Sequence, residues 1–179
     1  MSLIIKKNTT FKIPKTAPNI AYANGLYGKR YVGYFADNVS WFNTATLHGD
    51  VINLTVFDQF SSNDDYYSWQ WLGYFKASST ENYTFYTSSD DASYVWIGPN
   101  ALAGFTTANA NVNNGGLHGP DEVASSPISL TAGVYYPIRI QFGENEEGDE
   151  ISFSFSTPTI PQTTQGLGYY YYNSVTNGF

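Results

Sequence analysis

In the late part of the chain, apolar residues recur at every second position in two neighbouring segments. They are Tyr136, Ile138, Ile140 and Phe142 in the first segment and Ile151, Phe153 and Phe155 in the second. Because successive side chains of an extended chain point to opposite faces, this period places each apolar set on one face of a sheet. The two segments therefore predict neighbouring strands with a buried face, which commits the chain to a β architecture.

Shorter runs of the same kind precede these two, and turn residues separate them. Strands are expected at 51–57, 69–75, 83–87 and 94–97. No segment combines helical periodicity with capping residues, and a short helix or turn is expected only at Ser61–Asp65. Aromatic residues make up 18% of the 179 residues, a composition that suits half-buried sheets. We predict an all-β fold, an antiparallel β-sandwich at 21–179 that follows a basic N-terminal arm at 1–20.

Charge is distributed unevenly along the chain. The net charge is −7, yet six of the eight basic residues lie within the first 30, which hold none of the fifteen acids. The chain after residue 30 is therefore strongly acidic and repels the phosphate backbones of nucleic acids. A nucleic-acid partner is not expected. No apolar run approaches the ~20 residues of a membrane-spanning helix, and no secretory signal follows Met1. We expect no membrane insertion, and a location outside the cell or on a virion surface.

Two further segments differ from the alternating runs. Residues 99–127 are rich in Gly, Asn and Ala and are too long for a simple hairpin loop, so we expect a functional loop there. Asn113 and Asn114 are its candidates for ligand contact. Near the C-terminus, four consecutive tyrosines at Tyr169–Tyr172 predict a closing strand, with an interface as the alternative.

Two adjacent carboxylates, Asp90 and Asp91, follow the strand expected at 83–87. On a regular strand they would point to opposite faces, so they can share one ion only where the backbone bends sharply, as a cis peptide bond allows. Calcium takes oxygen ligands and tolerates irregular geometry better than magnesium does. The pair Asp90 and Asp91 thus indicates either a calcium site or an ordinary solvated turn. We interpret the pair Asp64-Asp65 as such a turn.

A second acidic segment, 143–150, lies between the two clearest strands and predicts a hairpin loop. Five of its residues between 144 and 150 are acidic. Taken alone the segment is typical of a solvated turn, because the acids that an EF-hand loop needs at its first and twelfth positions are missing. Glu144, Asn145 and Glu146 are its candidates for ligand contact.

Three segments, in this order, resemble the protective-antigen fourteen-kilodalton (PA-fourteen) domain family, which includes lectin domains of yeast flocculins and related adhesins. They are Gly25-Leu26-Tyr27-Gly28, then 69–101 with its tryptophan strand, Gly-Tyr-Phe step and Ser-Asp-Asp, then 130–158 with its Gly-x-Tyr-Tyr-Pro-Ile run. The resemblance covers about 25–158. It implies a jelly-roll-type β-sandwich.

The resemblance also implies a surface calcium ion held by Asp90 and Asp91 across a cis peptide bond. Asn145 matches the family's loop asparagine, with Glu144 as the alternative register, and groups at Glu147 and Asp149, chiefly backbone carbonyls, would complete the metal site. In the lectin members the ion binds vicinal sugar hydroxyls directly. The yeast lectins carry Trp in this loop where this chain has acids, so the resemblance does not extend to their mannose specificity.

Tryptophan side chains are the remaining candidates for sugar contact. Trp41, Trp69, Trp71 and Trp96 could each stack on a sugar face. Burial in the core is favoured for each in a domain this rich in aromatics. Trp41 is the best candidate for an exposed ring, because it follows a turn at 37–40.

Catalysis is not expected. His48 and His118 lie far apart beside glycines in expected loops, and the chain has no Cys and no Gly-x-Ser-x-Gly elbow. The predicted function is a calcium-dependent, lectin- or adhesin-like domain that binds a cell-surface glycan. The alternative is a structural or host-attachment component of a viral particle, which contacts other virion or surface proteins through the N-terminal arm or the tyrosine-rich tail.

Overall fold

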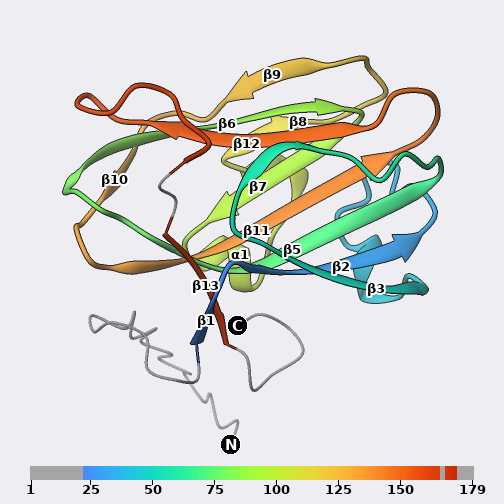
Figure 1. Ribbon diagram of the computed structural model, residues 1–179, viewed down its shortest axis with the longest axis horizontal. Helices are drawn as coiled ribbons and strands as arrows, with labels where there is room; N and C mark the ends of the chain where they lie inside the picture. Colours follow the sequence, from blue (N-terminus) through green and yellow to red (C-terminus); the bar gives the residue numbers. More distant parts are fainter. Residues whose placement is uncertain (1–21, 166–167, 173–179) are drawn as a thin grey trace, which may run out of the picture.

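The computed structural model describes residues 22–165 and 168–172, which form two stacked antiparallel sheets (Figure 1). The eight-stranded sheet contains β1 (Tyr22–Asn24), β2 (Leu26–Val32), β3 (Leu47–Leu54), β5 (Tyr67–Lys76), β7 (Ser93–Ile97), β8 (Val112–Asn114), β11 (Tyr135–Glu144) and β13 (Gly168–Tyr172). The five-stranded sheet contains β4 (Phe57–Phe60), β6 (Glu81–Asp90), β9 (Asp121–Ala124), β10 (Ile128–Leu130) and β12 (Glu150–Ser156). The predicted all-β sandwich is confirmed. The basic arm expected at 1–20 lies outside the described residues.

The core fills the space between the sheets. The alternating residues of β11 and β12 supply much of it, since Ile138, Ile140 and Phe142 pack with Ile151, Phe153 and Phe155. Trp69 and Trp71 are fully buried and their rings stack at 5.3 Å. Trp96 is buried as well, in a second aromatic cluster on the outer face of the eight-stranded sheet. The preference for core burial of these three tryptophans is therefore confirmed.

The strand expected at 51–57 is wrong as a single element. β3 ends at Leu54 in one sheet and β4 begins at Phe57 in the other. The chain changes sheets here because the Phe57 ring enters the core, where it meets the Trp71 ring edge-on at 5.1 Å. No helix forms at 61–65, where bends lead into β5 and Asn63 has a positive φ of 51°.

The functional loop expected at 99–127 is not irregular throughout. It contains helix α1 (Pro99–Leu102), the 3-10 helix η2 (Thr107–Asn109) and two short strands, β8 and β9. Its first part packs on the outer face of the eight-stranded sheet. The buried Arg139 of β11 donates to the Ala101 carbonyl at 2.9 Å, and its guanidinium lies 4.0 Å from the centre of the Phe105 ring. A third short helix, η1 (Trp41–Asn43), packs on the same face through Phe42.

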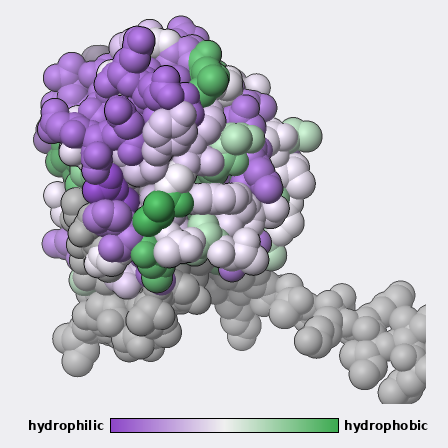
Figure 2. Space-filling model, turned by 90° about the vertical axis from the view of Figure 1, so that its right-hand side faces the viewer, coloured by the Kyte–Doolittle hydropathy of each residue, from purple (hydrophilic) through white to green (hydrophobic). Residues whose placement is uncertain are grey.

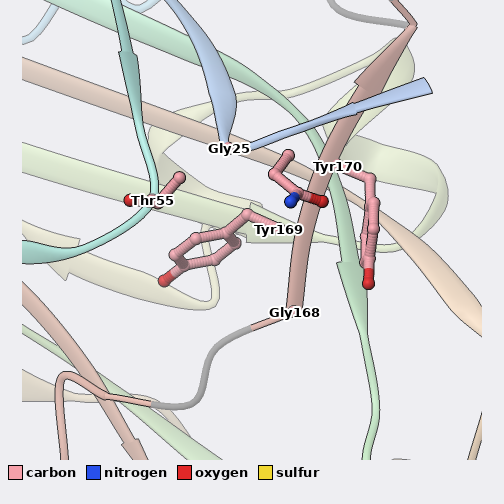
Figure 3. A pocket seen from close by; sticks show the side chains of 6 residues that line it. Gly25, Thr55, Gly168, Tyr169 and Tyr170 are labelled. Carbon is pink, nitrogen blue, oxygen red and sulfur yellow. The ribbon is translucent and has the colours of Figure 1, made fainter.

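The tyrosine tail forms β13, which pairs with β1 and β5, so the predicted closing strand is confirmed. Tyr169 and Tyr170 extend to opposite sides of β13 (Figure 3). Beside them lies a hollow of about 230 Å³. Its described lining holds no carboxylate, imidazole or amine: Asn24, Gly25, Thr55, Gly168, Tyr169 and Tyr170. This hollow is therefore not the candidate functional site.

Strand pairing brings the acidic residues to one end of the sandwich. In the eight-stranded sheet, Glu144 at the end of β11 pairs with Tyr67 at the start of β5, and Phe142 pairs with Ser93 at the start of β7. In the other sheet, Asp90 at the end of β6 pairs with Glu150. This is the right-hand end in Figure 1. No helix among the described residues is long and apolar enough to cross a membrane.

Candidate metal and ligand site

Three carboxylates meet at this end of the sandwich. Asp90, Asp91 and Glu144 each place one oxygen within 4.8 Å of the others. The peptide bond between Asp90 and Asp91 is cis, as predicted. Asp91 and Glu144 are buried, and Asp90 is half-buried. Asp90 thus forms the solvent-facing side of the cluster, and Glu144 forms the side that faces the protein interior.

Glu144 continues the buried row of β11. It follows Ile140 and Phe142 at the same period of two, so its side chain points between the sheets. No described residue offers a hydrogen bond to either carboxylate oxygen. Burial, together with repulsion from Asp91 and Asp90, raises the pKa of Glu144 to about 8. Burial, and then the neighbouring Asp91, likewise raises the pKa of Asp90 above its usual value.

Asp91 is oriented by two loops. Its Oδ1 accepts from the backbone N–H of His118 at 2.9 Å, and its Oδ2 accepts from the backbone N–H of Asn145 at 3.1 Å. Hydrogen bonds to an ionised carboxylate are among the stronger ones in proteins. Both oxygens of this carboxylate therefore have a fixed direction before any ligand binds.

Buried hydroxyls support the Asp90–Asp91 turn from inside the sandwich. Ser89 Oγ donates to the Asp91 carbonyl at 2.6 Å, and the Asn114 amide donates to Ser89 Oγ at 3.1 Å. Asn114 is 3% exposed and also donates to the Asp121 carbonyl. Asn114 was predicted to contact a ligand, but its amide nitrogen is engaged beneath the turn.

The loop between β11 and β12 passes over the cluster. The Asn145 carbonyl accepts from the Tyr66 N–H at 3.1 Å, and the half-buried Asn145 side chain follows Glu144 directly. Glu146 is exposed, and its carboxylate accepts from the Tyr66 hydroxyl at 2.7 Å. At Gly148 an added Cβ would lie 3.1 Å from Asp90 Oδ2. Glycine therefore lets the loop backbone come close to this carboxylate.

The last predicted ligands of this loop are Glu147 and Asp149. Glu147 is exposed and has a positive φ of 82°. The Asp149 carboxylate accepts from the Ser61 hydroxyl at 2.6 Å and the Tyr67 hydroxyl at 2.6 Å. Burial would raise the pKa of Asp149, but these hydrogen bonds and one from the Ser62 backbone outweigh it and hold the pKa below its usual value. This side chain anchors the β4–β5 connection, which leaves the backbone carbonyl as the group available to an ion.

Other predicted residues make their contacts elsewhere. Asn113 is exposed and donates to the Thr107 carbonyl in η2. Trp41 is half-buried, with its ring edge-on to Tyr31 at 6.1 Å. His48 lies in strand β3, not in the expected loop, while His118 lies beside Asp91 through its backbone.

Sequence reasoning named Glu144 for ligand contact, and as a metal ligand only in the alternative register to Asn145. The signal for its role was its position two residues after Phe142, which continues the buried alternation. Tyr66 and Leu117 flank the cluster and carried no signal of their own. Tyr66 could be placed beside Asn145 only once the pairing of β5 with β11 was known.

The donor set of the cluster suits a hard cation. Carboxylate and carbonyl oxygens are the ligands that calcium prefers. A buried carboxylate without a partner is costly unless a cation or a proton neutralises it. The unpartnered oxygens of Glu144, next to Asp90 and Asp91, therefore fit a divalent ion.

Comparison with solved structures places the fold. An anti-sigma factor domain-containing protein from Clostridium clariflavum is 18% identical over 81% of this chain and 47% of that chain, with a TM-score of 0.62. The chain spans about half the length of such proteins. The A domain of epithelial adhesin 9 from Candida glabrata, in complex with Galβ1-4GlcNAc, is 16% identical over 92% of this chain and 96% of that chain, with a TM-score of 0.62.

The PA14 domain of the antifreeze protein MpAFP is 11% identical, covers 92% of this chain and 96% of that chain, and has a TM-score of 0.60. The fold is that of PA14 domains, as the sequence resemblance predicted. No curated protein matches the chain at a significant level. The GLEYA domain family matches residues 67–157, which make up just over half of the chain and include Asp90, Asp91 and Glu144. The chain therefore belongs to the GLEYA domain family.

Proposed function

We propose that this protein is a calcium-dependent carbohydrate-binding domain of the adhesin type. The observation that carries the proposal is the cluster of Asp90, Asp91 and Glu144, in which both oxygens of Glu144 are buried and find no hydrogen-bond donor among the described residues. A divalent cation compensates such charge where hydrogen bonds do not. Membership of the GLEYA family and the likeness to an adhesin domain bound to Galβ1-4GlcNAc support a saccharide as the ligand.

In this proposal the carboxylates of Asp90, Asp91 and Glu144 hold the ion. The Asn145 side chain and the backbone carbonyls of the 145–149 loop supply further oxygens, and the approach of Gly148 to Asp90 lets this loop close over the ion. When bound, calcium supplies open coordination positions that accept vicinal hydroxyls of a sugar. Contacts of Glu146, Asn113 and Trp41 with the sugar remain predictions.

The arrangement suits binding better than hydrolysis. Glycosidases hold their two carboxyl groups about 5–5.5 Å or about 6.5–9.5 Å apart and give them opposed roles. Here three carboxylate oxygens converge within 4.8 Å, which suits a shared cation. We therefore propose a non-enzymatic domain that acts outside a cell or at a surface. No observation among the described residues favours a virion component.

Binding to an array of immobilised glycans in about 2 mM calcium tests the proposal. We expect binding that is lost in EDTA, restored by added calcium, and lost in Asp90→Asn. Asp58→Asn is the matched control, because Asp58 is an exposed aspartate in β4. Glycan binding that persists unchanged in EDTA would reject the proposal.

A further inference from the structure

The exposed large apolar side chains of the described residues gather at one end of the molecule. They are Val32 at 53% exposure, Leu47 at 51%, Tyr66 at 54% and Leu117 at 65%. All four lie at the end that carries the acidic cluster. Strand pairing puts Val32 opposite Tyr67 and Leu47 opposite Tyr31, while hydrogen bonds tie Tyr66 to Asn145 and the residue after Leu117 to Asp91. Figure 2, which faces this end, shows strongly hydrophilic residues over one part and isolated hydrophobic ones among paler neighbours. An exposed apolar side chain gains free energy when a ligand covers it, so the position of these four beside the acidic cluster bears on what that end binds.

Tyr66 is held rigidly although more than half of it is exposed. Its N–H donates to the Asn145 carbonyl at 3.1 Å, and its carbonyl accepts from the Gly33 N–H at 2.8 Å. Its hydroxyl donates to Glu146 at 2.7 Å, and its φ is +52°. An aromatic ring is thus fixed in a solvent-exposed position beside the loop that carries Asn145.

Leu117 is held in place on the other side of Asp91. The next residue, His118, donates its N–H to Asp91 Oδ1, while Asn145 donates to Asp91 Oδ2. The preceding residue, Gly116, donates to Asp37 at 3.2 Å, and its carbonyl accepts from the hydroxyl of Tyr34 at 3.4 Å. The turn is therefore bonded on both sides of Leu117, whose side chain remains in solvent.

Tyr34 connects the two positions. The backbone of Gly33, its chain neighbour, bonds to Tyr66, and the Tyr34 hydroxyl bonds to Gly116. The Tyr34 ring also lies close to the cluster. Its pKa is raised first by burial and then by the charges of Asp37, Asp91 and Glu144. Hydrogen bonds of Gly33 and of the Tyr34 hydroxyl thus link Tyr66 to the turn that carries Leu117, beside the three carboxylates.

We propose that Tyr66 and Leu117, joined by Tyr34, form an apolar rim that determines which saccharide the ion site accepts. The inference rests on the proposed function and names further residues for it. A pyranose ring has polar edges and apolar C–H faces, and such a face packs on aromatic and aliphatic side chains. The rim takes the C–H face while the hydroxyls meet the ion. The ligand class is therefore a saccharide in which an apolar C–H face adjoins the hydroxyls that bind the ion.

Calorimetric titration of Galβ1-4GlcNAc into the calcium-saturated protein tests this inference. We expect Tyr66→Ala and Leu117→Ala each to weaken sugar binding about threefold to tenfold, the range of a stacking contact. Tyr66→Phe keeps the ring and retains most of the affinity. Leu47→Ala, equally exposed at the same end but not bonded to a partner of Asp91, leaves it unchanged. Calcium affinity, measured separately, stays the same in all four variants.

Each other outcome decides against a particular claim. Unchanged sugar affinity in both alanine variants, with binding of the unaltered protein still lost in EDTA, overturns the rim and leaves the proposed function standing. A parallel loss of calcium affinity means that the two residues only hold the loops, and it also overturns the rim. If calcium-saturated protein binds array glycans but not Galβ1-4GlcNAc, the array glycan that binds most tightly replaces it in the titration, and unchanged affinity in both alanine variants then overturns the rim. Self-association that Leu117→Ala abolishes would assign the surface to a second copy.

Discussion

Glu144 occupies a position where the alternation of β11 calls for an apolar side chain. Its row continues from Ile138 through Phe142 into the core, and Glu144 ends that row with a carboxylate that is 0% exposed. A buried charge without partners destabilises a protein, so its presence needs a compensating group. The proximity of Asp90 and Asp91 is the reason that we propose a cation as that group.

Replacement of Glu144 by Gln tests this role. We expect the calcium affinity of Glu144→Gln to fall at least about tenfold, equivalent to about 1.4 kcal/mol, because one charged ligand is lost. In EDTA the variant should unfold at no lower temperature, since a buried carboxylate has been removed. Calorimetry and thermal denaturation measure the two effects. Glu147→Gln, an exposed side chain of the same loop, should match the unaltered protein, and equal calcium affinity in Glu144→Gln would contradict the role.

Two aromatic rings, of Phe35 and Tyr34, pack so closely against Gly143 that no larger residue fits there. An added Cβ would clash with Phe35 Cδ1 and would lie 2.9 Å from Tyr34 Cδ2. We expect Gly143→Ala to lower the free energy of unfolding by about 1–3 kcal/mol, because the rings must move within a packed cluster. Denaturant titration measures this change. Gly119→Ala is the control, because a Cβ at Gly119 meets nothing within 4 Å, and it should cost less than about 0.5 kcal/mol. Similar stabilities of the two variants would show that the Phe35 and Tyr34 rings move aside at little cost.

At the scale of single residues, the sequence predicted only those parts of the site that are adjacent along the chain. Asp90 and Asp91 stand together at the end of a strand, so their cooperation could be inferred. The metal role of Glu144 depends on which face of β11 it occupies and on the approach of β7. Tyr66 and Leu117 depend on pairings between segments more than thirty residues apart, such as Gly33 with Tyr66. No local pattern carries that information.

At the scale of elements, the segment 99–127 shows where local composition misleads. Its Gly, Asn and Ala content is typical of an irregular loop, yet α1, η2, β8 and β9 form within it. Contacts from distant residues hold it, since the Trp96 indole donates to the Thr106 carbonyl and to Asn109, both at 3.0 Å. The single strand expected at 51–57 failed for a similar reason, because core packing of Phe57 redirects the chain. Strands with strong alternation, by contrast, were predicted correctly.

Asn109 is the main polar link in this segment. Its side chain accepts from the Thr106 N–H and the Trp96 indole, and donates to the Gly104 carbonyl. We expect Asn109→Ala to destabilise the protein by about 1–3 kcal/mol, because three hydrogen bonds of its side chain are lost and the Trp96 indole keeps only the Thr106 carbonyl as an acceptor. Exchange of the Trp96 indole proton, measured by NMR, should become faster. Asn113→Ala removes one surface hydrogen bond and serves as the control, and equal exchange in both variants would contradict the link.

At the scale of the whole molecule, the sandwich gathers the residues of the proposed site at one end of its two sheets. The ends of β6 and β11 and the starts of β5 and β7 bring residues from four strands and their loops together. Residues 31–179 hold all fifteen acidic residues and only two of the eight basic ones, so this part of the chain is strongly acidic. Cations therefore also bind weakly and nonspecifically to such an acidic surface. This binding must be distinguished from binding at a specific site.

Salt separates these two kinds of binding. Exposed charges are screened within about 3–10 Å at high ionic strength, whereas buried charges are screened much less. We expect about 2 mM calcium to raise the melting temperature in 0.5 M sodium chloride nearly as much as in low salt, because a specifically bound ion stabilises the folded state. Magnesium at the same concentration should raise it less. A calcium effect that vanishes in high salt would indicate loose surface binding.

Calorimetric titration of calcium into chelator-treated protein is the most direct measurement of the central claim. We predict saturable binding of about one ion per chain, as expected for a single shared site with oxygen ligands. In Asp91→Asn that binding should be lost, because Asp91 is the carboxylate that both flanking loops orient towards the cluster. Absence of calcium binding at millimolar concentration, or equal binding by Asp91→Asn, would contradict the assignment of Asp90, Asp91 and Glu144 as a cation site.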